Sequence, residues 1–98
     1  MPALTPAKIE TVRHVVAEAF GPGASIWLFG SRAAGKEGGD VDLFVETPGA
    51  VADCLPKRLA ARRRLEALLE EKVDLIVRDG SDSPQAIDAI AKETGVRL

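Results

Sequence analysis

The stretch WLFGSRAAGKEGGDVDLFVE, which runs from Trp27 to Glu46, decides how this chain folds. An apolar run ends at a Gly-Ser pair, crosses a glycine-rich turn, and resumes as an alternating segment that carries Asp40 and Asp42. Aspartate is depleted in β-strands, so two aspartates in an otherwise apolar strand need a reason. Side chains two residues apart in a strand project from the same face, about 6.5–7 Å apart along it. Two carboxylates placed there repel each other unless a cation lies between them.

The residues around this stretch predict two strands of one sheet. The segment Ser25–Phe29 is β-branched and aromatic and ends at a glycine, and the segment Asp40–Glu46 alternates between apolar and polar faces. Only the ten residues Gly30–Gly39 join the two segments, which favours an antiparallel pair.

The remaining elements follow from helix-capping residues and hydrophobic periodicity. A first helix is predicted with Thr5 as N-cap, Pro6 at its first position and Gly21 after its end. Further predicted elements are a helix over Leu55–Glu71, a strand over Lys72–Arg78, a helix with Ser83 as N-cap, Pro84 at its first position and Gly95 as C-cap, and a short closing strand in VRL. The order is helix, strand, strand, helix, strand, helix. It predicts an α/β (α+β) fold with a small mixed sheet and helices packed on one face.

Length and composition limit what the chain can be. Its 98 residues predict a single domain over 1–98. Thirteen basic and fifteen acidic side chains leave a net charge of −2, so strong binding to nucleic acid through bulk charge is not expected. No membrane association is expected, because the apolar run IWLF is far too short to span a bilayer. Cys54 is the only cysteine and no signal peptide is evident in MPALTPAKIE, which favours the cytoplasm.

A third aspartate strengthens the interpretation as a metal site. Asp74 lies in the apolar segment KVDLIV, and a strand there that runs beside Asp40–Glu46 would add its carboxylate to the other two. Mg²⁺ prefers oxygen ligands and is usually held by one or two carboxylates together with substrate phosphates. The plain alternative for the Asp-x-Asp pair alone is that Asp40 caps the glycine turn and Asp42 faces solvent.

The Gly-Ser pair before these aspartates suits a phosphate. Gly30 lets an anion approach the backbone closely, and Ser31 offers a hydroxyl and a backbone N–H. Three carboxylates on adjacent strands beside such a turn make a two-metal site for in-line displacement at phosphorus.

Together, FGSRAAGKEGGDVDLFVE and the later KVDLIV resemble the minimal nucleotidyltransferases of the DNA polymerase beta superfamily. The resemblance covers nearly the whole chain. It implies that Gly30 and Ser31 hold the triphosphate, that Asp40 and Asp42 bind Mg²⁺, and that Asp74 completes the site and helps to activate the acceptor hydroxyl. It also implies transfer of a nucleoside monophosphate from an NTP, with ATP expected, and release of pyrophosphate. Some members pair with helical HEPN-type toxins as antitoxins that adenylylate the toxin.

Two departures from the family pattern lie in the turn before the first aspartate. The spacer after the Gly-Ser pair is slightly shorter than is common, and Gly39 stands where a serine often precedes the first aspartate. Arg32 follows the Gly-Ser pair, and its guanidinium can bind the triphosphate or form an ion pair with a nearby aspartate.

Three other features have plain explanations. Gly30–Lys36 matches most of a Walker A loop, but Glu37 replaces its hydroxyl residue and no helix can follow, so a P-loop is rejected. His14, the only histidine, is expected at the surface of the first helix. Arg62 lies in register with apolar residues of its helix, and it can contact a phosphate or an acidic partner or extend along the surface.

Three functions compete at this point. The first is an Mg²⁺-dependent nucleotidyltransferase whose acceptor is presented by a partner protein. The second is a non-catalytic antitoxin that neutralises its partner by binding it. A structural domain without a ligand is the third, and it is disfavoured because three unpaired carboxylates would destabilise the sheet.

Overall fold

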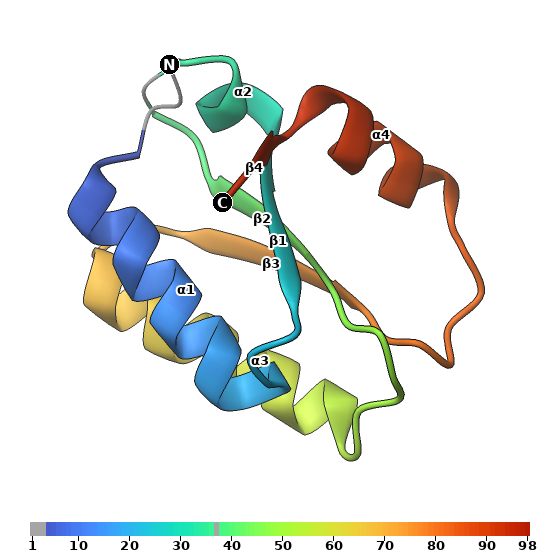
Figure 1. Cartoon of the computed structure of the whole chain (residues 1–98). Coiled ribbons are helices and arrows are strands. Elements are labelled where there is room, and N and C mark those ends of the chain that lie inside the picture. The colour runs from blue at the N-terminus through green and yellow to red at the C-terminus, as the bar shows by residue number, and fades with distance from the viewer. Residues whose placement is uncertain (1–3, 37) are drawn as a thin grey trace.

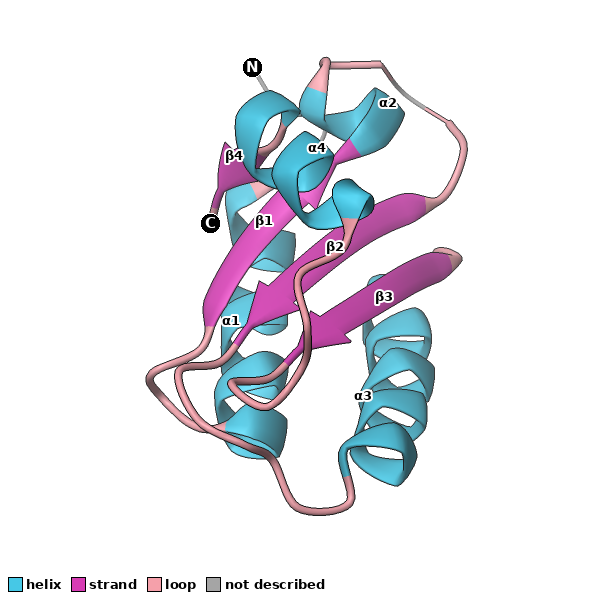
Figure 2. Ribbon diagram, turned by 90° about the vertical axis from the view of Figure 1, so that its right-hand side faces the viewer, coloured by secondary structure: helices cyan, strands magenta, loops and turns pink. Residues whose placement is uncertain are grey.

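The computed structural model describes residues 4–36 and 38–98, and these form a four-stranded mixed sheet covered by helices. The elements in chain order are α1 (Pro6–Phe20), β1 (Ser25–Phe29), α2 (Gly30–Ala33), β2 (Val41–Glu46), α3 (Cys54–Leu69), β3 (Val73–Arg78), α4 (Ala86–Thr94) and β4 (Val96–Arg97). The strand order is β3-β2-β1-β4 (Figure 2). As predicted, β1 is antiparallel to β2. The closing strand β4, for which no partner was predicted, is antiparallel to β1. β2 and β3 run parallel, because α3 carries the chain back between them.

The first helix begins where its capping residues predict. The Thr5 hydroxyl accepts a hydrogen bond from the Lys8 backbone N–H at 3.3 Å, and Pro6 is the first helical residue. Gly21, at φ +95°, ends the helix. Between these ends, α1 buries Val12, Val15, Val16 and Phe20.

The main core lies between the sheet and the pair α1 and α3, which occupy the same face (Figure 1). Every second residue of β1, β2 and β3 points into it, as period-2 alternation requires. The strand residues of this core are Ile26, Leu28, Val41, Leu43, Val45, Val73, Leu75 and Val77. Because these side chains point toward the helices, their neighbours in sequence point to the opposite face.

That opposite face is partly covered by α4 (Figures 1 and 2). Phe44 is fully buried there, and its ring centroid lies 5.7 Å from that of Trp27. The Lys92 Nζ of α4 lies 5.5 Å above the Trp27 ring, and the Arg97 guanidinium of β4 lies 5.0 Å from it. The α+β fold with a mixed sheet is therefore confirmed. The expectation that all helices pack on one face was wrong for α4, which covers Trp27 and Phe44 on the face opposite α1 and α3 (Figure 2).

The start of α4 differs from the prediction. Ser83 and Pro84 were expected to begin the helix, but Gln85 is its N-cap and Ala86 its first residue. Asp88 explains the shift, because its carboxylate accepts from the Gln85 backbone N–H at 3.1 Å and from Arg78 Nε at 3.0 Å. The prediction for Ser83 and Pro84 was wrong because this tie to the end of β3 fixes the first turn.

Among the described residues, no helix combines the length and apolar character that crossing a membrane requires.

Candidate functional site

Two of the predicted carboxylates meet at the N-terminal ends of β2 and β3. Asp42 and Asp74 are aligned partners in the parallel pair. Their sequence neighbours point into the main core, so both aspartates project from the other face of the sheet. Asp42 is half-buried and Asp74 is exposed. The sheet therefore holds this carboxylate pair side by side at one end of two adjacent strands.

Asp40 is placed differently from the expectation. It precedes β2, is exposed, and follows Gly38 and Gly39, which have φ angles of +84° and +74°. Over residues 4–36 and 38–98, no three Asp, Glu, His or Cys side chains come close enough together to form a metal-binding group. The sheet fixes the Asp42–Asp74 pair, whereas the position of Asp40 depends on the glycine turn before it.

The electrostatics of this place favour a cation. Burial raises the pKa of the Asp42 carboxyl, and the negative charges of Asp74 and Asp40 raise that pKa further. No cation among the described residues lowers this pKa again. A divalent cation with oxygen ligands would supply a compensating positive charge, because it would bind the Asp42 and Asp74 oxygens and draw Asp40 toward them. The donor set therefore fits Mg²⁺.

The Gly-Ser turn lies directly against Asp42. Phe29, the last residue of β1, is aligned with Asp42, and Gly30 follows it at φ +73°. A Cβ on Gly30 would overlap the Asp42 Oδ2 atom and lie 3.2 Å from its Cγ. A Cβ on Gly39 would lie 3.3 Å from Ser31 Oγ, so the two glycine segments approach each other here. The residues predicted to bind phosphate and those predicted to bind metal therefore lie next to one another.

Arg32 binds the backbone of the glycine turn. Its Nε donates to the Gly38 carbonyl at 3.0 Å, one terminal nitrogen donates to the Gly39 carbonyl at 3.3 Å, and the guanidinium forms an ion pair with Glu71. The residue is only 8% exposed. The ion-pair alternative is therefore the observed one, with Glu71 in place of the expected aspartate, and a triphosphate role for Arg32 stays a prediction.

The family model for the nucleotidyltransferase domain matches residues 9–96. The chain belongs to the nucleotidyltransferase domain family. This match confirms the family inferred from the Gly-Ser pair and the three aspartates.

Solved structures share the fold of this nucleotidyltransferase domain. One is a mutant of the toxin–antitoxin complex MntA–HpeT, with 20% identity and a TM-score of 0.69 over 92% of this chain and 69% of the matched one. A second mutant of that complex shows 16% identity and a TM-score of 0.70 over 92% and 70%. The third is a tri-AMPylated Shewanella oneidensis HEPN toxin in complex with MNT antitoxin, with 18% identity and a TM-score of 0.68 over 93% and 68%. At these identities the likeness shows the fold. No curated protein matches the chain in sequence.

Glu71 is a site residue that sequence reasoning missed. Besides Arg32, its carboxylate binds Lys8 of α1 at 3.0 Å, and it lies three residues before Asp74. The hydrogen bond from Arg32 and then that from Lys8 lower the pKa of Glu71. It therefore connects α1, the Gly-Ser turn and the start of β3. Two adjacent glutamates end the Leu55–Glu71 segment, and nothing in the pattern distinguishes the one that turns inward.

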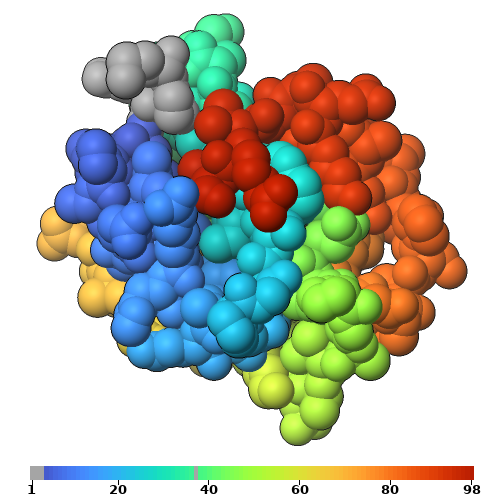
Figure 3. All heavy atoms as spheres, in the orientation of Figure 1, coloured from blue at the N-terminus to red at the C-terminus, as the bar shows by residue number. Residues whose placement is uncertain are grey.

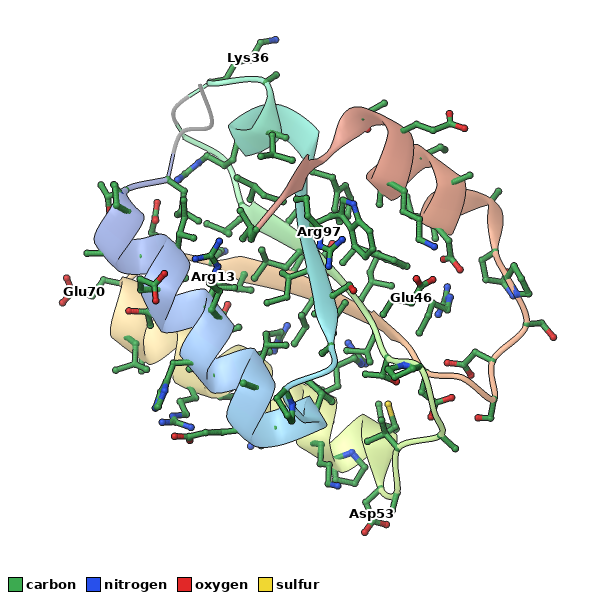
Figure 4. All side chains as sticks on the ribbon, viewed as in Figure 1. Arg13, Lys36, Glu46, Asp53, Glu70 and Arg97 are labelled. Atoms are coloured by element: carbon green, nitrogen blue, oxygen red, sulfur yellow. The ribbon has the colours of Figure 1, made fainter. Side chains whose placement is uncertain are left out.

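The geometry of the nucleotidyltransferase domain agrees with the rejection of a Walker A loop. Lys36 is exposed and points away from the body of the molecule (Figure 4). The chain enters β2 after the turn rather than the helix that a P-loop needs. His14 is likewise exposed on α1, where it pairs with Glu18 at 2.6 Å.

A hollow lies at the opposite, C-terminal ends of β2 and β3. It has a volume of about 500 Å³ and lies beneath the segment that leads into α4, coloured orange in Figure 3. Both cations that line it are paired, Arg78 with Asp88 at 3.0 Å and Lys92 with Glu46 at 2.6 Å. None of the predicted site residues lines this hollow.

Proposed function

We propose that this nucleotidyltransferase domain transfers AMP from Mg²⁺-bound ATP to a hydroxyl group on a partner protein. The observation that carries the proposal is the alignment of Asp42 with Asp74 beneath Gly30, where a side chain would displace the Asp42 carboxylate. Two carboxylates that need a cation therefore lie next to the backbone turn that is proposed to hold a phosphate. That combination supports in-line transfer at phosphorus.

The metal that carries the triphosphate would be held by Asp42 and Asp40, and Asp74 would complete the site on the side of the acceptor hydroxyl. When bound, Mg²⁺ neutralises the phosphate charge that the three carboxylates would otherwise repel. Gly30 and Ser31 supply the turn against which the triphosphate rests. Arg32 keeps this turn in place through its hydrogen bonds to the Gly38 and Gly39 carbonyls. We also propose that its guanidinium contacts the triphosphate.

The chemical step needs one proton acceptor from the protein. The acceptor oxygen attacks the α-phosphorus, a new oxygen–phosphorus bond forms, and the bond to the bridging oxygen of the β-phosphate breaks. Pyrophosphate leaves with that bond's electron pair. Asp74 takes the proton of the acceptor hydroxyl and, because its side chain is exposed, passes it to water.

A partner protein is part of the proposal. The related folds occur in complexes of an MNT antitoxin with a HEPN toxin, and one of those toxins is AMPylated. A HEPN-type helical protein is therefore the acceptor that we propose. The same complexes favour a second candidate function, in which the chain neutralises its partner by binding alone. A cytoplasmic location also belongs to the proposal and rests on the unpaired Cys54.

The test compares three aspartate variants in transfer of labelled AMP to a co-expressed HEPN partner. Asp74→Asn should keep ATP binding and lose transfer by roughly 10²–10⁴-fold, the range of a positioned base. Asp42→Asn should lose both ATP binding and transfer, because its carboxylate adjoins both the cation and the turn. Asp53→Asn is the control, since Asp53 is exposed at the far end of the molecule and asparagine tolerates its left-handed backbone (Figure 4).

Parental transfer by Asp74→Asn would remove Asp74 from the mechanism. If the parent binds its partner tightly but transfers no AMP, the binding function replaces the catalytic one.

A further inference from the structure

The outer edge of β3 is covered by side chains of α3 in an unusual way. β3 ends the sheet, so its outward backbone groups have no neighbouring strand. Glu66 Oε2 accepts a hydrogen bond from the Val73 N–H at 3.1 Å, and Arg58 Nη1 donates to the Leu75 carbonyl at 3.1 Å. Two α3 residues thus cap the strand edge immediately before and after Asp74.

Arg62 lies between these two capping residues on α3. It is four residues after Arg58 and four before Glu66, so the three share one stripe of the helix. Its neighbours on the stripe bind the residues on either side of Asp74, which places Arg62 beside the edge at Asp74. Among the described residues, the Arg62 Nε is buried and has no hydrogen-bond partner. A buried donor without a partner destabilises a fold, so this one needs an explanation.

The same edge is hollowed. A hollow of about 330 Å³ is lined by Arg58, Asp74 and the β3 residues Leu75, Ile76, Val77 and Arg78. The stripe of α3 that carries Arg62 continues into exposed Leu55 and Leu59, whose side chains are 58% and 36% accessible. The same edge of the molecule, between α3 and β3, therefore presents apolar surface, arginine side chains and the proposed proton acceptor Asp74.

We propose that this α3–β3 edge, defined by Arg58, Arg62 and β3, docks the acceptor segment of the partner protein. The occupant is an extended, acidic segment whose hydroxyl residue lies at Asp74. A carboxylate next to that hydroxyl binds Arg62, and an apolar residue farther along contacts Leu55 and Leu59. The charge fits, because Arg58 and Arg78 line the hollow beside Asp74. Arg62 is the next arginine along α3, and guanidinium binds carboxylate in a fixed, two-pronged geometry. The inference rests on the proposed transfer to a protein hydroxyl and identifies the sequence class that receives AMP.

A stability measurement tests the first half of this proposal without any ligand. Arg62→Met keeps the length of the side chain and removes the unpartnered Nε, so its melting temperature should equal or exceed that of the parent. Arg63→Met is the matched control, since Arg63 is the next residue and fully on the exposed side of α3. If Arg62→Met melts lower than Arg63→Met, Arg62 supports the fold and the proposal is overturned.

A transfer measurement tests the second half. The probes are two pools of peptides that carry one tyrosine, serine or threonine, flanked by glutamate in one pool and by glutamine in the other. The parent should label the acidic pool about tenfold more, the effect of one charged hydrogen bond. Arg62→Gln should reduce this preference to about one, while Arg63→Gln should keep it.

The remaining outcomes are also decisive. An acidic preference that survives in Arg62→Gln overturns the proposal, and so does a parent that binds MgATP but labels neither pool. If Arg62→Gln loses affinity for MgATP, the edge binds the nucleotide and the proposal is overturned. If the parent is a dimer and Arg62→Gln is a monomer, the edge binds a second copy of the chain and the proposal is likewise overturned. A parent that binds no MgATP fails the proposed function instead, and the stability comparison still decides the role of Arg62.

Discussion

Replacing Gly30 by alanine is the sharpest test of the carboxylate site. Alanine at φ +73° costs about 1–3 kcal/mol of backbone strain. Its Cβ would also overlap Asp42 Oδ2 and lie 3.2 Å from Cγ, so the Asp42 carboxylate must rotate away at a further cost of about 1 kcal/mol. For a domain of this size each kcal/mol lowers the melting temperature by about 4–8 °C. Gly30→Ala should therefore fold, with a clearly lower melting temperature.

The matched control is Gly21→Ala. Gly21 has a φ angle of +95°, but a Cβ there would meet nothing within 4 Å. Both variants thus carry backbone strain, and only Gly30→Ala disturbs the Asp42 carboxylate. In thermal unfolding with Mg²⁺ at about 100 times its dissociation constant, the parent and Gly21→Ala should gain about 2.7 kcal/mol. Gly30→Ala should gain almost nothing, because the displaced carboxylate no longer lies beside Asp74.

An unchanged Mg²⁺ response in Gly30→Ala would refute the reasoning. It would mean that Asp42 does not bind the metal, or that it binds from a position that leaves Gly30 free. Loss of the response in Gly21→Ala as well would show that backbone strain alone weakens metal binding, and the contact with Asp42 would then carry no weight.

Two further predictions concern charge. Because the folded pKa of Asp42 is raised, the folded state holds its proton longer than the unfolded state, and stability falls as the pH rises from about 4 through the raised pKa. Asp42→Asn should remove this fall in stability. Without metal its free energy of unfolding at pH 7 should exceed that of the parent by about 1–2 kcal/mol, because the repulsion from Asp74 at about 5 Å is lost. Urea unfolding across pH checks this. Because the pKa of Glu71 is lowered, its contribution is present above the unfolded value and lost as the pH falls through the folded one. Glu71→Gln should lower the free energy of unfolding by about 2–3 kcal/mol at pH 7, because its ion pair with Arg32 is lost. The difference from the parent should shrink below about pH 4. The control Glu70→Gln should change little, because the Glu70 side chain points outward (Figure 4).

The strands and their aspartates were predictable because local chemistry decides them. The alternation over Asp40–Glu46 sets which residues face the core, and the crossover helix forces the next strand to run parallel. Those two facts bring Asp42 beside Asp74 with no further information. The need for glycine at position 30 was predictable as well, although the group that the structure places against its backbone is the Asp42 carboxylate, and phosphate binding there stays a prediction.

The features that escaped prediction depend on contacts between distant segments. Asp88 fixes the start of α4 through Arg78, and neither Ser83 nor Pro84 carries a local signal of that tie. Glu71 binds Lys8 and Arg32, which lie 63 and 39 residues away in the chain. Local propensity and periodicity cannot choose among charged residues whose partners are decided by the assembled fold.

The packing around Trp27 makes the protein its own optical probe. Trp27 is the only tryptophan of the chain, and its ring lies close to cations from α4 and β4 on the face opposite the main core. Its fluorescence therefore reports how the last 13 residues, from Ala86 onward, sit on the sheet, and it is largely blind to the packing of α1 against α3. Emission reports the layer that contains α4, whereas far-ultraviolet circular dichroism averages over all helices and strands, so a difference between their melting curves would measure how independently α4 detaches.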